Sequence, residues 1–401
     1  MINSVELFCG AGGLALGFHQ AGFRPKALIE WDKDSCESIR SNIADGFCNT
    51  VDWNVMQTDV RLVNYSEFGL DVHFVTGGPP CQPFSLGGKH KAHSDVRDMF
   101  PEAVRAVREL RPQGFVFENV KGLLRNSFSS YFNYILLQLT HPEIIANSDM
   151  NWTDHLRLLE EYHSKGSRDG LEYNVAFRLL NAADYGVPQI RHRVIIVGFR
   201  NDLDINWSFP EQTHTKEALL YAKYGDGSYW EEHKIPKRLR SELSSADKRI
   251  DGQLMLPYAN RIRWQTVRDA IKELPDPRSD LASTYSNHEY RGGARQYMGH
   301  SGSVQDEPSK AIKAGVHGVP GGENTMVLDS GELRYYTVRE SARIQTFPDD
   351  YNFRGSWTES MRQIGNAVPV RLAYLIGDSI ANHFERMNAN NAQRHTAIRA
   401  I

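Results

Sequence analysis

The chain has 401 residues, of which 40% are hydrophobic and 24% are charged, and its formal net charge is −3. These values are ordinary for a globular protein of one or two domains. No apolar run approaches the length of a membrane span, and the N-terminus begins as a strand without a basic leader, so we expect neither a membrane segment nor a signal peptide. The chain is not basic overall, so contact with a polyanion would require positive charge gathered on one face.

The cysteines are few, and all of them fall in the first fifth of the chain: Cys9, Cys36, Cys48 and Cys81. None of them are spaced as metal-ligand pairs. The pattern predicts free thiols in a reducing compartment, the cytoplasm, with no disulfide framework and no metal site.

Strand-like and helix-like segments alternate along the first 200 residues. Strands are expected at 5–8, 27–29, 72–75, 114–117, 175–180 and 194–199, and helices at 14–21, 34–43 and 98–110. A third crossover is expected to end near 58–60, with Asp59 at the end of the third strand. A polar insertion at 141–170 is expected to form a helix and a loop. This alternation predicts an α/β fold, with a doubly wound and mostly parallel sheet.

The alternation stops after residue 200. Residues 201–330 contain few long apolar runs and many turn residues, which predicts a smaller and irregular second domain. Helical patterns return at 337–346 and 370–386, and the polar end, 388–401, is expected to fray. The predicted limits are therefore 1–200, 201–330, 331–387 and 388–401.

A glycine-rich turn with Gly10 and Gly12 follows the first predicted strand. Glycines there let a ligand approach the backbone closely, although the spacing departs from Gly-x-Gly-x-x-Gly and disfavours a dinucleotide. Glu30 ends the second strand, where a ribose hydroxyl is bound in nucleotide-type folds. Trp31 offers a flat face to a base, and Asp59 could accept from an adenine amino group. Together these residues favour a binding site for an adenosine-bearing ligand. The alternative is that the glycines only form a turn and that Trp31 belongs to the core.

The segment Gly77-Gly78-Pro79-Pro80-Cys81 ends the fourth predicted strand and displays a thiol at the edge of the sheet. Cys81 is either a packed residue or a nucleophile, and a nucleophilic thiol needs help to lose its proton. Glu118 ends the next strand and can lie beside this turn. A carboxylate would not assist a thiolate electrostatically, but it suits contact with a substrate that accepts a proton or donates from an amine.

The segment Gln189-Ile190-Arg191-His192-Arg193 precedes the last strand. In an extended segment Gln189, Arg191 and Arg193 point to one side. Two guanidiniums and an amide on one face suit contacts with anions or base edges, and the alternative is a solvated basic edge.

The sequence resembles the cytosine-C5 DNA methyltransferase family of prokaryotic restriction-modification systems. The motifs that carry the resemblance follow one another in the family order from end to end. They are Leu7-Phe8-Cys9-Gly10-Ala11-Gly12-Gly13, Gly78-Pro79-Pro80-Cys81-Gln82-Pro83-Phe84-Ser85, Glu118-Asn119-Val120, Gln189-Ile190-Arg191-His192-Arg193, Thr337 to Pro348 and Gly365-Asn366-Ala367-Val368-Pro369-Val370.

The resemblance implies a mechanism. The target cytosine is flipped out of the duplex, Cys81 attacks C6, and C5 takes the methyl group of S-adenosylmethionine. Glu118 holds N3 and the amino group of the base, and Arg193, together with Arg191, holds the base carbonyl and the catalytic loop. Loss of the C5 proton and release of Cys81 complete the reaction.

The same resemblance implies the binding residues. Besides the glycine loop, the residues that would line the cofactor pocket are Phe8, Glu30, Trp31, Asp59, Pro80, Asn366 and Val368. The loop with Ser85 and Arg97 would close over the DNA. Residues 1–200 would form the catalytic and cofactor-binding domain and 201–330 the target-recognition domain, with 331–387 returning to the catalytic domain.

Basic residues gather in the expected target-recognition domain, among them Arg238, Arg240, Arg261 and Arg263. With Gln189, they are candidates for contacts with DNA, in which phosphate contacts set affinity and salt dependence. The alternative for most of them is a solvated charged face.

The leading hypothesis is thus a monomeric DNA cytosine-C5 methyltransferase, cytoplasmic and nucleoid-associated when bound to DNA. It would methylate a short site in duplex DNA, and a separately encoded restriction endonuclease would act on the same site. No association with a membrane is expected. Two alternatives are a tRNA cytosine-C5 methyltransferase and a catalytically silent DNA-binding homologue. Because Cys81, Glu118, Arg191 and Arg193 are all present, a silent homologue is disfavoured.

Overall fold

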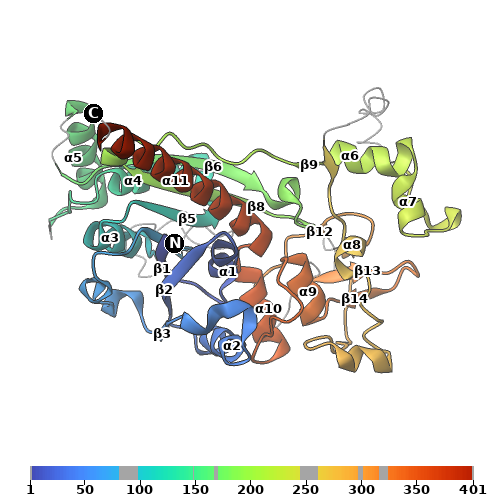
Figure 1. Ribbon diagram of the computed structural model, residues 1–401. Helices are drawn as coiled ribbons and strands as arrows, with labels where there is room; N and C mark the ends of the chain where they lie inside the picture. The colour runs from blue at the N-terminus through green and yellow to red at the C-terminus, as the bar shows by residue number, and fades with distance from the viewer. Residues whose placement is uncertain are drawn as a thin grey trace. The chain divides into compact units, whose positions relative to one another are not determined.

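The computed structural model describes residues 2–80, 98–147, 149–166, 170–243, 261–296, 301–315 and 324–399 (Figure 1). The chain forms two compact units. Unit 1 comprises Met1–Leu180, His192–Pro210 and Ala373–Ile401, and unit 2 comprises Asn181–Arg191 and Glu211–Leu372. Among the helices of the described residues, none has the length and apolar character needed to cross a lipid bilayer.

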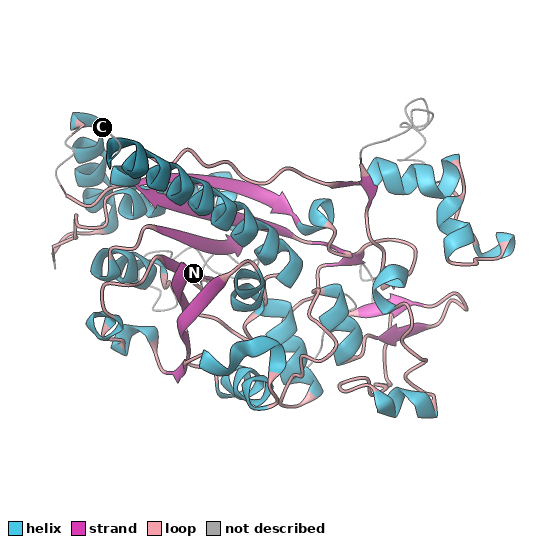
Figure 2. Ribbon diagram, in the orientation of Figure 1, coloured by secondary structure: helices cyan, strands magenta, loops and turns pink. Residues whose placement is uncertain are grey.

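A seven-stranded sheet forms the centre of unit 1 (Figure 2). In spatial order its strands are β3 (Val55–Gln57), β2 (Phe23–Glu30), β1 (Ile2–Leu7), β4 (Phe74–Gly77), β5 (Gly114–Val120), β8 (His192–Arg200) and β6 (Tyr173–Asn181). The first five run parallel, and β8 runs antiparallel to β5. Strand order reverses at β1, whose neighbours are β2 and β4, and in open α/β sheets ligands bind at such a point, outside the carboxyl ends of the strands.

Helices cover both faces of this sheet. On one face, Val5, Val75 and Phe117 belong to an apolar core with α3 (Phe100–Leu110) and α4 (Ser129–Thr140). On the other face, Phe384 of α11 (Val370–Arg399) lies 5.4 Å from the ring of Phe74. Also in unit 1 are α1 (Gly13–Gln20), α2 (Lys33–Ala44) and α5 (Trp152–Lys165). Strands buried between two helical layers explain the continuous apolar runs in the sequence.

Unit 2 is built from short elements. Its strands are β7 (Gln189–Ile190), β9 (His214–Thr215), β10 (Ile262–Arg263), β11 (Ser303–Val304), β12 (Ser309–Lys310), β13 (Thr325–Val327) and β14 (Leu333–Tyr335). They form the pairs β9–β10 and β7–β12 and the three-stranded sheet β11-β13-β14. Its helices are α6 (Lys216–Leu220), α7 (Ser228–Glu232), α8 (Val267–Ile271), α9 (Val338–Ile344) and α10 (Trp357–Asn366).

Buried arginines bind together the loops of unit 2. Arg339 donates to the carbonyl oxygens of Ser286, Pro348 and Tyr351 at 3.0 to 3.1 Å. Arg334 forms a two-pronged ion pair with Glu340, at 2.7 and 2.5 Å. Where regular ladders are short, these charge-assisted bonds satisfy carbonyl groups that would otherwise be buried without a partner.

The structure confirms the α/β class and the doubly wound, mostly parallel sheet. The insertion forms α5, and the motif at Thr337 begins α9 with a capping box between Thr337 and Glu340. The compact units follow a different division from the predicted domains, because 331–372 belong to unit 2 and 181–191 leave unit 1. The polar end, for which fraying is expected, continues α11 to Arg399. The functional roles of the predicted domains remain predictions.

Candidate active site

The loop after β1 has a backbone shape that brings amide groups to the carboxyl edge of the sheet. Phe8, Gly10 and Gly12 all have positive φ angles, of 55°, 54° and 77°. The amide of Gly12 donates to the carbonyl oxygen of Cys9 at 2.9 Å and closes the turn. Glycine adopts this conformation without cost, whereas a bulky Phe8 does so with strain, a condition often found at binding sites.

Glu30 organises this glycine loop. One carboxylate oxygen accepts from the amide of Gly10 at 2.9 Å, and the other accepts from the amides of Trp31 and Asp32 at 3.0 and 2.9 Å. Burial raises the pKa of Glu30, and these backbone bonds oppose the rise. Trp31 is 71% exposed at the end of β2, so its ring presents a large apolar face.

Asp59 follows β3 at the same edge of the sheet. Its carboxylate accepts from the amide of Arg61 at 3.0 Å and forms an ion pair with the guanidinium of Arg61. This hydrogen bonding to Arg61 lowers the pKa of Asp59, so the side chain is a carboxylate at neutral pH.

The turn after β4 is packed too tightly for larger residues. A Cβ atom at Gly77 would lie 2.4 Å from the carbonyl oxygen of Leu7, and one at Gly78 would lie 3.3 Å from Oε2 of Glu118. The carbonyl oxygen of Pro79 accepts from the side chain of Asn119 at 2.9 Å. Pro80, which is exposed, accepts from the amide of Met99 at 3.0 Å. The turn is thus fixed on both sides immediately before position 81.

Three predicted site residues lie outside the described residues: Cys81, Ser85 and Arg97. Their roles remain predictions.

Glu118 and Arg193 form an ion pair next to this turn. Nε of Arg193 contacts Oε1 of Glu118, and the two side chains are 14% and 10% exposed. The antiparallel pairing of β5 and β8 sets Val120 opposite Arg193 and so brings the guanidinium toward Glu118. A carboxyl group and a guanidinium are therefore held together where the chain leads into Cys81.

Gln189 and Arg191 have other partners, within unit 2. Both are buried, and Arg191 donates to the carbonyl oxygens of Ile312, Gly365 and Ala367. The prediction that these residues and Arg193 share a face assumes one continuous strand, but β7 ends at Ile190 and β8 begins at His192. Nearby in unit 2, Asn366 is exposed and Val368 is buried.

The predicted DNA-binding arginines have different surroundings. Arg238 is exposed, Arg240 donates to the carbonyl oxygen of Ile235 at 3.0 Å, and Arg261 donates to the carbonyl oxygen of Gln212. The guanidinium of the fourth, Arg263, is held by carboxylates of unit 2, which leaves it less able than Arg238 to contact phosphate.

Comparisons with known proteins identify the family of the chain. The family model described as C-5 cytosine-specific DNA methylase matches residues 2–142 and 152–382. The chain belongs to this family. It is a DNA (cytosine-5-)-methyltransferase, an enzyme whose substrate is DNA.

Similar relatives are type II methyltransferases. M.PspPI of Psychrobacter sp. (strain TA137) is 34% identical, over 94% of this chain and 78% of its own length. M.NgoMIV of Neisseria gonorrhoeae is 31% identical, over 96% of this chain and 99% of its own length. The fold is similar to that of the S. pombe Dnmt2 methyltransferase, with a TM-score of 0.55 and 16% identity, over 96% of this chain and 99% of that one.

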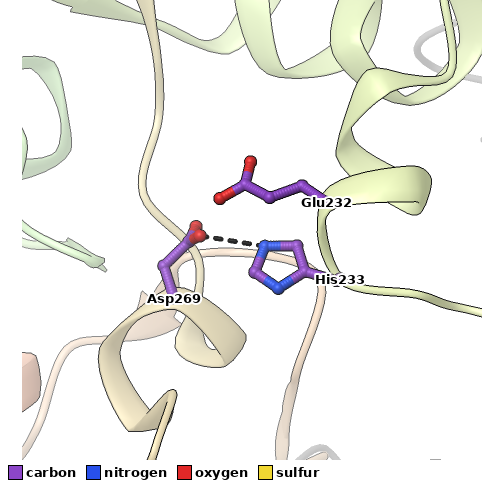
Figure 3. A group of neighbouring side chains, drawn as sticks. All are labelled: Glu232, His233 and Asp269. Carbon is purple, nitrogen blue, oxygen red and sulfur yellow. Dashed lines mark hydrogen bonds and ion pairs between the residues drawn. The ribbon is translucent and has the colours of Figure 1, made fainter.

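A second polar cluster of the enzyme lies in unit 2 and consists of Glu232, His233 and Asp269 (Figure 3). Nε2 of His233 lies 2.9 Å from Oδ1 of Asp269. Arg263 contacts both oxygens of Asp269, at 2.7 and 2.9 Å, and Glu232 at 2.9 Å. The carboxylates therefore have a cationic partner of the chain's own, and the arrangement joins β10 to α7 and α8 without calling for a metal ion.

Sequence reasoning missed several residues that shape the site. Asn119 fixes the turn before Cys81, and Glu6 lies buried on β1 below the glycine loop, with Oγ1 of Thr76 donating to it at 3.3 Å. Gln345 hydrogen-bonds to Gln189. Asn119 and Gln345 fall within matched motifs, and that position is the signal that could have drawn attention to them.

Proposed function

We propose that this methyltransferase uses S-adenosylmethionine to methylate C5 of a cytosine flipped out of a short, specific duplex site, through a covalent bond between Cys81 and C6. The observation that supports this most is the meeting of two loops at the reversal point of the sheet. The loop after β1 carries the glycines, and the loop after β4, which leads to Cys81 in the sequence, passes Glu118 at Gly78, where Glu118 pairs with Arg193.

The residues at the ends of β1, β2 and β3 fit an adenosine-bearing methyl donor. The glycine loop leaves its backbone open to close approach, since a Cβ at Gly10 would meet nothing within 4 Å. Glu30 can accept from ribose hydroxyls, the exposed Trp31 ring can stack on adenine, and Asp59 can accept from its amino group. Phe8, Gly12 and Pro80 complete this set in unit 1, and Asn366 and Val368 of unit 2 are proposed as further cofactor residues.

S-adenosylmethionine, when bound, supplies an electrophilic methyl group on a sulfonium. Cys81, as the thiolate, would form a bond to C6 and push electron density to C5, which would accept the methyl group as the bond between that group and the sulfonium sulfur breaks and leaves a neutral thioether. When the C5 proton is lost to a base, the electron pair of that bond restores the C5–C6 double bond, and the bond from C6 to sulfur breaks. Cys81 is thereby regenerated.

Glu118 and Arg193 would act on the opposite side of the pyrimidine. Attack at C6 raises electron density at N3, and a protonated or proton-sharing Glu118 would stabilise it there. Arg193 would hold Glu118 in position and hydrogen-bond to the base carbonyl. Arg191, which the sequence also suggests for this set, donates to carbonyl oxygens of unit 2 and is not proposed as a contact of the base.

DNA contacts are proposed for Ser85 and Arg97 in the catalytic loop and for residues 201–330. Of the latter, Arg238 is exposed, whereas the guanidinium of Arg263 is held by Glu232 and Asp269, so Arg238 is better placed for phosphate contacts than Arg263. Arg240 is half-buried and stays in the proposed set. Arg261 also stays in the proposed set, whereas Gln189 is fully buried and bonded to Gln345, so the contact with DNA that the sequence suggests for it is not proposed. Protection from a separately encoded endonuclease, a monomeric state and a nucleoid location belong to the same proposal.

A duplex with 5-fluorocytosine in place of cytosine tests the covalent step. Fluorine at C5 cannot leave as a proton does, so the enzyme should stay bonded to DNA through Cys81 after methyl transfer. We expect a denaturant-resistant adduct with the wild type only when S-adenosylmethionine is present, and none with Cys81→Ala. An adduct formed by Cys81→Ala, or no adduct with a protein that binds the donor and the DNA, would contradict the mechanism.

A further inference from the structure

The C-terminus of α10 is held by side chains from distant parts of unit 2. The last carbonyl groups of a helix lack partners within it and must find them elsewhere. Here the acceptors are the carbonyl oxygens of Ile364, Gly365 and Ala367, which surround Asn366 in the chain. What binds these carbonyls therefore fixes the position of Asn366.

Arg191 supplies two of the hydrogen bonds to these carbonyls. Nη2 donates to the carbonyl oxygens of Gly365 at 2.5 Å and Ala367 at 3.1 Å, and Nη1 donates to that of Ile312 at 2.9 Å. The side chain is only 1% exposed. A buried cation at a helix C-terminus is favoured by the helix dipole and forms strong, charge-assisted bonds.

Two glutamines complete this network. Nε2 of Gln345 donates to the carbonyl oxygens of Ile364 and Ala367, at 2.7 and 3.0 Å. Its Oε1 accepts from Gln189 at 2.9 Å, and Oε1 of Gln189 accepts from the amide of Ile312 at 2.9 Å. Both glutamines are fully buried, so water does not compete for the hydrogen bonds of this network.

Close packing holds the same turn from the side. A Cβ at Gly365 would lie 2.3 Å from the amide nitrogen of Ala314, so only glycine fits there. Between the two fixed neighbours, Gly365 and Ala367, the side chain of Asn366 is exposed. The geometry is that of a rigid turn that presents one amide side chain.

We infer that Arg191 is a positioning residue, which holds the Asn366–Val368 segment in the conformation that binds the methyl donor and does not contact the cytosine. Its terminal N–H groups face backbone and side-chain oxygens of unit 2, whereas Arg193 pairs with Glu118 in unit 1. The inference rests on the proposed cofactor role of Asn366. It assigns different tasks to two arginines that lie two positions apart.

Steady-state kinetics of the full-length protein separate these tasks. Arg191→Lys keeps the charge but loses the planar fork, so we expect the KM and Kd for S-adenosylmethionine to rise roughly tenfold, with kcat at saturating donor nearly kept. Asn366→Ala should act in the same way, and the double variant should be no worse than Asn366→Ala. Arg193→Lys should instead lower kcat. Arg157→Lys, an exposed helical arginine, is the matched control.

Other outcomes would overturn the inference. A lower kcat with unchanged donor affinity in Arg191→Lys would place Arg191 with Arg193, in contact with the base. Additive losses in the double variant would show that Arg191 does not act through Asn366. If the wild type does not bind the donor at all, the proposed function fails first, and that result is visible before any variant is made.

Two further measurements distinguish a loss of positioning from misfolding of the variant. Amide hydrogen exchange should quicken at 364–370 in Arg191→Lys while β1 and β4 keep wild-type protection. Gln345→Ala leaves Arg191 in place but removes two bonds to the same carbonyls, and it should weaken donor binding by a smaller factor. Unchanged exchange at 364–370, or unchanged donor affinity in both variants, would contradict the positioning role.

Discussion

At the scale of single residues, Glu118 and Arg193 are the proposed catalytic residues whose geometry the structure describes most directly. Both are largely buried, and their ion pair lies beside Gly78, just before the proposed nucleophile. In the proposed mechanism the carboxyl group of Glu118 would contact the base, and the guanidinium of Arg193 would limit the free-energy cost of burying that carboxyl group.

Glu118→Gln tests this role. The amide keeps the shape but cannot share a proton with N3, so we expect kcat to fall roughly 100-fold, with donor and DNA affinities within about threefold of wild type. Glu109→Gln, on the exposed side of α3, is the control. A variant with wild-type kcat would remove Glu118 from the mechanism.

Glu6 makes a pH-dependent contribution to stability. Burial raises its pKa from 4.5 to about 8, so the folded state keeps a proton that the unfolded chain releases near 4.5. The folded state then binds more protons than the unfolded state between these values, and stability falls as pH rises through this window, by at most about 1.4 kcal/mol per pH unit.

Glu6→Gln should therefore flatten the pH dependence. Urea unfolding at about pH 5 and about pH 8 would measure it, with the variant gaining on the wild type at the higher value because glutamine mimics the protonated acid. Parallel stability curves for the two proteins would show that Glu6 is not the source.

Strand ends explain which site residues could be predicted. Glu30, Trp31 and Asp59 follow recognisable strands, and the carboxyl ends of parallel strands meet at one edge. The partners of Arg191 could not be predicted, because they are backbone carbonyls more than a hundred positions away. The alternation of side chains along a strand predicts which of them share a face only while the strand is unbroken.

At the scale of elements, short pieces of unit 2 depend on buried ion pairs. Burial opposes the charge of Asp269, but hydrogen bonds from Arg263 and His233 outweigh it and hold the pKa of Asp269 well below its usual value. This carboxylate links β10 to α7 and α8.

Arg263→Ala should destabilise unit 2 by about 3 kcal/mol, because it leaves Asp269 buried without its cation. Thermal unfolding measures the loss, and Arg238→Ala, on the exposed surface, is the control. If Arg263→Ala unfolds like the wild type yet binds DNA poorly, Arg263 is the phosphate contact that the sequence suggests.

Gly77→Ala and Gly78→Ala probe the spacing of β1 and β4. The first would bring a Cβ to 2.4 Å from a backbone oxygen, whereas the second meets only the end of the Glu118 side chain, at 3.3 Å. We expect Gly77→Ala to lose roughly 2 kcal/mol or more of stability, measured by urea unfolding, and Gly78→Ala to fold but lose activity. Equal stability of the two would contradict this packing.

Element type was predictable for unit 1, whose buried strands are long apolar runs. The antiparallel direction of β8 could not be predicted, because an apolar run does not indicate in which direction its strand will pair. The path of the chain from β6 through β7 determines that direction. Unit 2 shows little regular pattern because side-chain bonds, as from Arg339, replace ladders.

At the scale of the whole molecule, the family assignment rests on matches that extend from residue 2 to residue 382. The division into compact units could not be derived from composition, since unit 2 takes in 181–191 from the middle of the catalytic motifs. Gln189 and Arg191 thereby become part of the unit that contains Asn366.

The most direct test of the account is a map of 5-methylcytosine. The gene would be expressed in a methylation-free host, and the host DNA would be analysed by bisulfite sequencing beside DNA from cells that express Cys81→Ala. We predict methylation of one cytosine within a single short sequence, and none with the variant. Unmethylated DNA in cells that contain folded wild-type protein, or equal methylation with Cys81→Ala, would contradict it.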